Sequence, residues 1–299
     1  MAVVTNTMTR YDAIGIREDL SNIIYNISPE TTPFVSNMSK RRSISNTFFE
    51  WQTDSLSAAA ANKQIDGDDV GSFTAQTPTV RLGNYTQIMR KVYVIADNLN
   101  GAIDEAGRRS ELAYAITKNG NELKRDLEFN LVGVNAAAAA GATGTARATA
   151  SLSAFIKTNT SKGSGGADPT VSSGVVNAAR TDGSARAITE ALLKTVLQAV
   201  WTQGGDPKFL MVGAHVKTVV SGFAGIAAQR YMAPSDSPTT IIGAADVYMS
   251  DFGSISIVPN RFSRARDAYV IDPDLCELAT LRPMQQVELA KTGDASKGM

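Results

Sequence analysis

The chain has 299 residues, of which 43% are hydrophobic and 19% charged, so its composition is that of a globular protein and excludes disordered and fibrous classes. Its 29 basic residues are balanced by 29 acidic ones, and without a net charge a dedicated DNA-binding protein is not expected. The only cysteine, Cys276, excludes an intrachain disulfide framework and fits a reducing cytoplasm.

Residues 1–45 are predicted to form an extended arm, because polar and scattered apolar residues alternate there without a sustained period. One short helix is expected over Ile14–Ile27, since the prolines in Ser28–Pro33 end it. The start MAVVTNTMTRYDAIG lacks the basic-then-apolar pattern of a signal peptide. No stretch approaches the roughly 18 apolar residues of a membrane span, so we expect a soluble protein that is not exported by the general route.

Two strands are predicted on either side of a long polar segment. In Ile44–Thr53 and again in Thr79–Ile95, apolar side chains share one side of a period-two pattern. The segment between them, Asp54–Pro78, is rich in Ala, Ser, Gly, Asp and Thr and has almost nothing to bury. A connection this long is typical of a functional projection, so we expect a long hairpin that becomes ordered against a neighbour. Its tip is interpreted as a solvated acidic turn formed by Asp66, Asp68 and Asp69.

The longest helix is predicted over residues 103–140. Leucine, isoleucine and valine recur there at helical spacing, the first turn is acidic, and Gly141 is a suitable terminator. Residues 141–187 are low in complexity and predict loops and short strands around one apolar group, Leu152, Phe155 and Ile156.

The remainder of the chain predicts a mixture of helices and short strands. A helix opened by Thr189 runs to Trp201, a buried strand covers Lys208–Val212, and a second helix covers Ala214–Gly222. Further strands are expected at Asp246–Ser250, Gly253–Val258, Ala268–Ile271 and Glu277–Leu289, the last interrupted by Pro283. The expected fold class is therefore α+β.

The residues that could carry enzyme chemistry are few. His215, the lone histidine, could act as a general base at a strand end, but a helix-start residue with local hydrogen bonds is the favoured interpretation. Cys276 is interpreted as a small buried hydrophobic residue in a strand. Asp272 and Asp274 flank Pro273 and are expected to cap a turn, since further oxygen ligands for a metal ion are missing nearby. We therefore expect no catalytic, cofactor-binding or metal-binding residues.

Glycine-rich and basic segments are also better explained without a ligand site. Gly163–Gly166 and Gly204–Gly205 lack the lysine and hydroxyl residues of a phosphate-binding loop and predict turns. Short basic clusters lack interleaved aromatic residues, so intersubunit salt bridges or diffuse contact with packaged DNA are expected rather than sequence readout. These clusters are Lys40–Arg42, Arg90–Lys91 and Arg261–Arg266.

The order of elements and several segments together resemble one family of proteins. The chain is similar to major capsid proteins of tailed bacteriophages with the HK97-like fold, a fold shared with encapsulins and the herpesvirus capsid floor, and more closely to the SU10-like podophage major head proteins. The segments that carry the resemblance are Asp19–Phe34 (DLSN to PETTPF), Phe155–Thr160 (FIKTNT), Glu190–Leu193 (EALL), Leu210–Gly213 (LMVG), Val258–Phe262 (VPNRF) and Leu281–Pro283 (LRP).

This resemblance implies an architecture. The implied parts are an N-terminal arm (1–45), an extended β-hairpin loop with its base (46–102), a peripheral domain with a spine helix (103–184), an axial domain (185–262) and return strands (263–299). Bending is expected at the spine helix and near Gly83 and Gly101. In the family another strand-rich stretch follows the run that corresponds to Ala290–Asp294, whereas this sequence stops at Met299.

The resemblance also implies a function. The expected protein is a non-enzymatic subunit that forms hexamers and pentamers of an icosahedral head, assembled in the host cytoplasm and located in the virion. Its implied partners are copies of itself, a portal, scaffold or decoration proteins, and packaged double-stranded DNA through non-specific contact, but not a membrane. A lysine crosslink between subunits would need Lys63 and is not expected. The alternatives are an encapsulin-type compartment shell and a small-molecule enzyme that uses His215 and Asp272.

Overall fold

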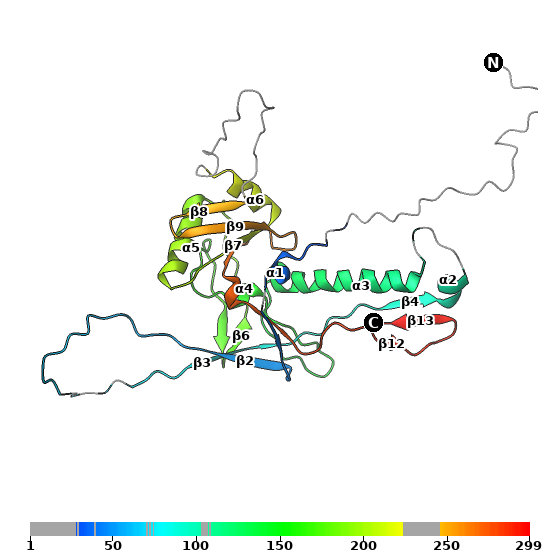
Figure 1. Cartoon of the computed structure of the whole chain (residues 1–299), viewed down its shortest axis with the longest axis horizontal. Helices are drawn as coiled ribbons and strands as arrows, with labels where there is room; N and C mark the ends of the chain where they lie inside the picture. The colour runs from blue at the N-terminus through cyan, green and yellow to red at the C-terminus, as the bar shows by residue number, and fades with distance from the viewer. Residues whose placement is uncertain are drawn as a thin grey trace, which may run out of the picture. The chain divides into compact units, whose positions relative to one another are not determined.

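A computed structural model describes residues 30–223 and 246–299, together with Ser28 and apart from residues 39, 70, 72, 74, 103–106 and 108 (Figure 1). The helix predicted over Ile14–Ile27 lies outside the described residues. The chain divides into two compact units. The first contains residues 91–120 and 286–299, and the second contains residues 30–90 and 121–285.

The first unit is built on a three-stranded antiparallel sheet with the order β12-β13-β4. Its elements are β4 (Tyr93–Ala96), α2 (Asp97–Ala102), the start of α3 (Glu111–Glu128), β12 (Glu288–Leu289) and β13 (Ala295–Gly298). Asp97, the first residue of α2, connects this helix to β13 and to the segment between β12 and β13. Its carboxylate accepts hydrogen bonds from Ser296 Oγ at 2.5 Å and from Lys291 Nζ at 2.5 Å. The N-terminus of α3 is capped by Ser110, whose Oγ accepts from the Ala113 amide at 3.2 Å.

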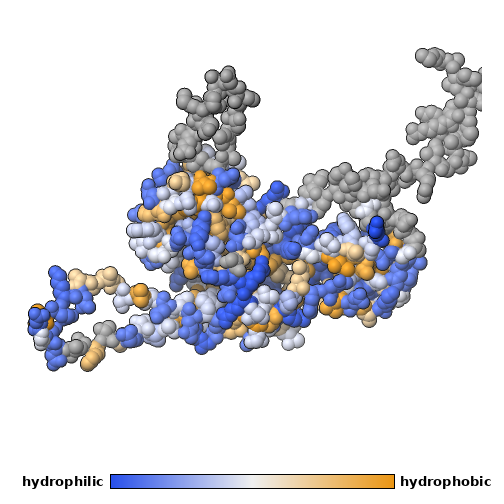
Figure 2. Space-filling model, viewed as in Figure 1, coloured by the Kyte–Doolittle hydropathy of each residue, from blue (hydrophilic) through white to orange (hydrophobic). Residues whose placement is uncertain are grey.

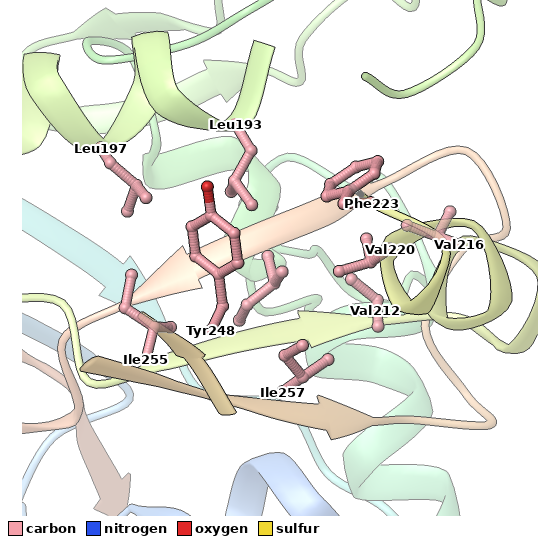
Figure 3. Packing of buried hydrophobic residues seen from close by; sticks show 10 residues of the cluster. Leu193, Leu197, Val212, Val216, Val220, Phe223, Tyr248, Ile255 and Ile257 are labelled. Carbon is pink, nitrogen blue, oxygen red and sulfur yellow. The ribbon is translucent and has the colours of Figure 1, made fainter. Parts of the chain in front are cut away.

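One layer of the second unit is a four-stranded sheet with the order β10-β7-β9-β8 and two helices against it (Figure 3). The elements are α5 (Glu190–Thr202), β7 (Phe209–Val212), α6 (Ala214–Ser221), β8 (Val247–Ser250), β9 (Gly253–Pro259) and β10 (Ala268–Ile271). Leu193 and Leu197 of α5 point at Tyr248 of β8. All four residues of β7 are buried, as expected for a central strand with covered faces.

A second sheet of this unit holds the predicted hairpin. Its order is β2-β3-β6-β5, with β2 (Phe48–Thr53), β3 (Val80–Tyr85), β5 (Thr170–Ser172) and β6 (Val175–Ala178). Trp51 packs on Phe155 of the short helix α4 (Leu152–Phe155) with ring centroids 5.7 Å apart. Nearby, β1 (Lys40–Ser43) pairs in parallel with β11 (Glu277–Thr280), and α1 (Pro33–Asn37) and the 3₁₀ turn η2 (Pro273–Leu275) lie beside these strands in sequence.

The long helix is shorter than predicted, and its end differs. It runs as α-helix over Glu111–Glu128, continues as one π-helical turn over Phe129–Gly133 (η1), and stops eight residues before Gly141. An added Cβ at Gly133 would lie 2.6 Å from the Phe262 carbonyl oxygen, so this residue marks a close backbone approach. The alanines that follow form no helix, and Ala139 pairs with Ala148. Alanine has a high helix propensity, and tertiary pairing overrides it here.

The strand predicted over Thr79–Ile95 is also wrong in its length. It is two strands, β3 and β4, which belong to different sheets and are separated by residues 86–92. The shared parity does not mark a buried face, since Ile88 and Val92 are 66% and 62% exposed. The strands β1 and β13 and the helix α1 were not predicted.

Several local predictions are confirmed. Thr189 caps α5 by accepting a hydrogen bond from the Leu192 amide at 3.4 Å, and the turn after this helix has Gly204 at φ +82°. The strand and helix predicted at Lys208–Val212 and Ala214–Gly222 are β7 and α6. Residues 141–187 contain only short elements, with Leu152 and Phe155 packed against buried clusters. Cys276 is half-buried and directly precedes β11 rather than lying within a strand.

Candidate functional site

The hairpin loop between β2 and β3 is a long segment of the second unit without regular secondary structure among its described residues. The two strands pair over six positions from Phe48↔Tyr85 to Thr53↔Val80, and the described residues from 54 to 79 form no strand or helix. Large apolar side chains recur along this loop and are almost fully exposed (Figure 2), namely Leu56 at 99%, Ile65 at 77% and Phe73 at 90%. Nothing in the described part of the chain covers them.

The tip of the loop is the acidic turn that the sequence predicts. The Asp68 amide donates to the Ile65 carbonyl at 3.2 Å, and Gly67 between them has φ +79°. The left-handed conformation of Gly67 closes the turn. The tip aspartates, Asp66, Asp68 and Asp69, are all exposed.

The base of the loop is held firmly. Asn84 of β3 is buried, and its side chain donates to Thr149 Oγ1 at 2.9 Å and accepts from the Ala150 amide at 3.0 Å. The Gly83 amide donates to the Gly174 carbonyl at 2.7 Å, and an added Cβ at Gly83 would lie 2.6 Å from the Phe48 ring. Gly83 therefore allows close packing of β3 on Phe48, and bending near Gly83 and Gly101 stays a prediction. The base of the loop is therefore well packed, whereas the described loop residues beyond it are all exposed.

A buried carboxyl group joins three distant segments at the end of α3. Glu128 is fully buried, and its oxygens accept hydrogen bonds from the Phe34 amide at 2.8 Å, the Val35 amide at 2.9 Å and Asn260 Nδ2 at 2.6 Å. Phe34 and Val35 lie in the first turn of α1, whose amides have no partner within the helix. The N-cap residue Thr32 makes no side-chain cap, so Glu128 replaces it. The carboxyl group thus holds the first turn of α1 against the end of α3.

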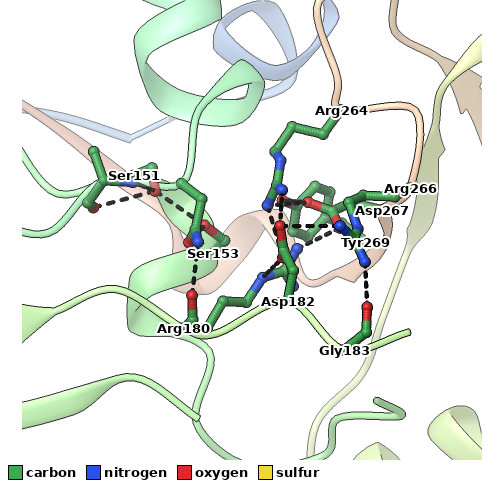
Figure 4. A network of polar contacts seen from close by, with 11 residues as sticks. Ser151, Ser153, Arg180, Asp182, Gly183, Arg264, Arg266, Asp267 and Tyr269 are labelled. Atoms are coloured by element: carbon green, nitrogen blue, oxygen red, sulfur yellow. Dashed lines mark hydrogen bonds and ion pairs between the residues drawn. The ribbon is translucent and has the colours of Figure 1, made fainter. Parts of the chain in front are cut away.

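A network of arginine and aspartate side chains connects the return segment to residues 180–183 (Figure 4). Arg264 and Arg266 both pair with Asp182, while Arg180 and Arg264 pair with Asp267. The hydrogen bond from Arg264 lowers the pKa of Asp182 below its ordinary value. These two arginines, for which the sequence predicted intersubunit or DNA contacts, therefore have carboxylate partners within the chain.

Tyr269 belongs to the same network, and both its burial and the neighbouring Asp267 change its pKa. Its hydroxyl donates to Asp267 Oδ2 at 2.9 Å, and burial, followed by the negative charge of Asp267, raises the pKa of Tyr269. The neutral phenol is therefore the form that the folded chain stabilises.

The residues weighed for enzyme chemistry are not brought together. His215 is exposed in the first turn of α6, where its carbonyl accepts from Thr218 Oγ1 at 2.7 Å. Asp272 caps the 3₁₀ turn η2 through the Asp274 amide at 3.0 Å, as predicted, and Asp274 pairs with Lys208. Burial raises the pKa of the Cys276 thiol, which makes the reactive thiolate less accessible. Among the described residues, no cluster of three potential metal ligands occurs and no helix has the length and hydrophobicity to cross a membrane.

Sequence reasoning missed the buried polar residues Glu128, Asn84 and Asn260. Each bonds to partners that are distant in sequence, between 65 and 132 residues away. The one available signal for Glu128 is its place in the run Leu127–Val132, where a carboxyl group interrupts a mostly apolar stretch. That signal indicates a buried acid but not its partners.

Comparison with the sequences of known proteins finds a matching family and a curated relative. The family described as "SU10 major capsid protein" matches residues 3–299. A curated relative, the "Major capsid protein" of Escherichia phage Phieco32, is 41% identical over 118 residues, which are 40% of this chain and only 33% of the relative. The match therefore spans about a third of the relative's length.

Solved structures share the fold at low sequence identity. The cyanophage A-1(L) capsid asymmetric unit aligns with a TM-score of 0.58 and 13% identity over 89% of this chain and 77% of that chain. A chain of Mycobacterium phage Cain aligns with a TM-score of 0.58 and 11% identity, covering 98% of this chain and 89% of that one. At these identities the similarity establishes the fold alone.

Proposed function

Because the chain belongs to the SU10 major capsid protein family, we propose that it is the major capsid protein of a tailed bacteriophage, whose copies assemble into an icosahedral head around the genome. The predicted α+β, HK97-like fold is confirmed by the structural relatives, which are phage capsid chains. The observation that carries the proposal is the extended loop, since Leu56, Ile65 and Phe73 lack cover within the described chain. Apolar groups so exposed are stabilised only when a second molecule buries them.

The proposal assigns a role to each part of the chain. Residues 185–262 surround the axis of hexamers and pentamers, residues 103–184 form the periphery, and residues 263–299 return to these domains. The loop with its base at residues 46–102 lies across neighbouring copies, and so does the part of the predicted arm (residues 1–45) that precedes α1, because α1 and β1 pack within the second unit. Support comes from the compact α5-β7-α6 layer, whose core is independent of the loop. Rings related by rotation and joined by equivalent contacts close into a shell.

Partners and location follow from this role. We propose contacts with a portal, with scaffold or decoration proteins where the phage encodes them, and non-specifically with packaged double-stranded DNA. The protein assembles in the host cytoplasm, resides in the virion and has no enzymatic activity. The exposed basic strand β1, with Arg41 and Arg42, supports a diffuse contact with phosphate. The solitary, exposed His215 supports the non-enzymatic role.

The experiment replaces residues 54–79 by Asn-Gly. Thr53 and Val80 are Cα partners, so a two-residue turn closes the ladder without strain. We expect the shortened subunit to be soluble and folded but to form no shells in electron micrographs, because the loop no longer reaches a neighbour. The unchanged chain is expected to sediment as a large closed assembly.

The matched control is Lys63→Ala, which alters the same loop without shortening it. This variant is expected to form shells, and shells of the unchanged chain should give a single monomer band after boiling in detergent, since no lysine crosslink is expected. Tryptophan fluorescence reports the fold of the shortened variant, because Trp51 packs on Phe155 at the loop base. Normal shells from the shortened chain would contradict the role of the loop, and an unchanged chain that remains monomeric would contradict the proposed function.

A further inference from the structure

A pocket beside the hairpin of residues 139–148 contains an arginine without a partner. The pocket has a volume of about 360 Å³ and is lined by Ile88, Ala140, Gly141, Ala142, Thr145, Ala146 and Arg147. Arg147 is half-buried, and its Nε is buried without any hydrogen-bond partner among the described residues. No ion pair of Arg147 with a described carboxylate occurs either. A buried N–H donor without an acceptor costs free energy, so the Nε of Arg147 would be stabilised by an acceptor from another molecule.

The local backbone is arranged to hold this arginine in place. The hairpin is closed by the pairs Ala139↔Ala148 and Ala142↔Thr145. An added Cβ at Gly141 would lie 2.8 Å from Arg147 Cγ, so the glycine leaves room for the arginine stem. Three alanines and Thr145 also line the pocket, and Ile88, 66% exposed, adds an apolar side chain. The pocket therefore has a lining that is about equally polar and apolar, together with one cation that forms no ion pair with a described residue.

We propose that this pocket receives the tip of the extended loop, Ile65–Asp69, from a neighbouring copy of the chain. This inference rests on the proposed function and names the surface that its loop contacts. A tip carboxylate pairs with the Arg147 guanidinium, and Ile65 covers Ile88. The guanidinium presents a planar fork of N–H donors, which matches the two oxygens of a carboxylate.

The chemistry of the tip complements the pocket. Ile65 is 77% exposed and is followed directly by Asp66, so one short turn supplies both an apolar group and carboxylates. Neither these aspartates nor Lys63 forms an ion pair with the other described residues. Each leg of a hairpin of this length reaches up to about 40 Å at about 3.3 Å per residue, which is enough to cross onto a neighbouring subunit.

The basic strand β1 is a second cationic surface with which Arg147 can be compared. Arg41 and Arg42 on strand β1 also lack ion-pair partners among the described residues, but both are exposed, and neither lines the pocket. Exposed charges interact weakly with a carboxylate because solvent screens them. We therefore expect the tip to require Arg147 rather than the β1 arginines.

The test is a charge exchange scored by shell yield of the purified chain. Arg147→Glu, and separately the triple change of Asp66, Asp68 and Asp69 to Lys, should each lower the yield at least about tenfold, as expected when one partner of a desolvated charge pair is reversed. Combining the two should restore much of the loss, because the pair is re-formed with opposite signs. Combining the reversed tip with Arg41→Glu and Arg42→Glu should restore nothing.

Each outcome is decisive. Arg147→Ala, which leaves no buried charge, serves as a second variant, and far-UV circular dichroism of unassembled subunits verifies that each variant is folded. Normal shells from folded Arg147→Glu or Arg147→Ala would overturn the inference while leaving the proposed function intact. Rescue by the β1 reversal, or no rescue by Arg147→Glu, would also overturn it. Failure of the unchanged chain to form shells would instead contradict the proposed function.

Discussion

Replacing Glu128 tests whether one carboxyl group holds α1 to the end of α3. Its oxygens accept three hydrogen bonds of 2.6–2.9 Å from donors in α1 and from Asn260, and its side chain is fully buried. Each of the three buried donors left without an acceptor costs about 1–2 kcal/mol, so Glu128→Ala should lower the free energy of unfolding by about 3–6 kcal/mol. Glu128→Gln keeps one carbonyl oxygen but places an amide against an N–H donor, and we expect about 2–3 kcal/mol.

Denaturant titration of unassembled subunits, followed by tryptophan fluorescence, measures these changes. The control is Glu277→Gln, an exposed glutamate on β11, which should change the free energy of unfolding by less than about 0.5 kcal/mol. A Glu128→Gln subunit as stable as the unchanged chain would refute the reasoning, since its hydrogen bonds would then contribute nothing net. A large loss in the Glu277→Gln control would show that the assay does not isolate the buried group.

Two further predictions concern packing and acid stability. Gly133→Ala should destabilise the chain by about 1–3 kcal/mol, because the new Cβ would lie 2.5 Å from the Phe129 ring. Gly120→Ala has open space around it and should stabilise α3 by about 0.5–1 kcal/mol. Thermal unfolding of the two variants measures the difference. Asp182, whose pKa is lowered by Arg264, contributes stability above its unfolded pKa, near 3.8, and loses it as the pH falls through the folded value. Asp182→Asn should therefore be less stable at pH 7 and lose less stability on acidification, as measured by denaturant titration at each pH.

Two results would contradict these predictions. Equal melting temperatures for the two glycine variants would mean that the chain shifts at Gly133 without cost. Parallel stability curves for the Asp182→Asn variant and the unchanged chain between pH 7 and pH 3 would mean that the Arg264 pair is not formed in solution.

The predictions that succeeded depend on interactions between neighbours in sequence. Thr189 caps the helix that follows it, Gly204 ends that helix, and the hydrophobic run at Phe209–Val212 becomes a buried strand. The acidic tip is a turn because Gly67 permits it. Each of these features is determined within a few residues, so a single sequence is sufficient to predict it.

The predictions that failed depend on contacts across the chain. Alanine favours a helix, yet residues 136–140 are not helical, because Ala139 pairs with Ala148 and the Ala138 amide donates to the Val176 carbonyl at 3.0 Å. The parallel pair of β1 with β11 places Arg41 opposite Leu278, and the short basic sequence of β1 has no periodicity that would predict this pairing. The cap supplied to α1 by Glu128 is equally non-local. The same reason limits site prediction, since neither Arg147 nor its pocket has a local signature.

The pairing of β4 with β13 has a consequence for synthesis on the ribosome. Tyr93 pairs with Gly298, so the central strand of the small sheet is made roughly 200 residues after its edge partner. At about 5–20 residues per second, β4 waits on the order of 10–40 seconds for that partner. During this interval the core layer around β7 can fold, while the small sheet cannot. Chains cut short during translation would therefore lack a finished sheet and be excluded from any structure that requires it.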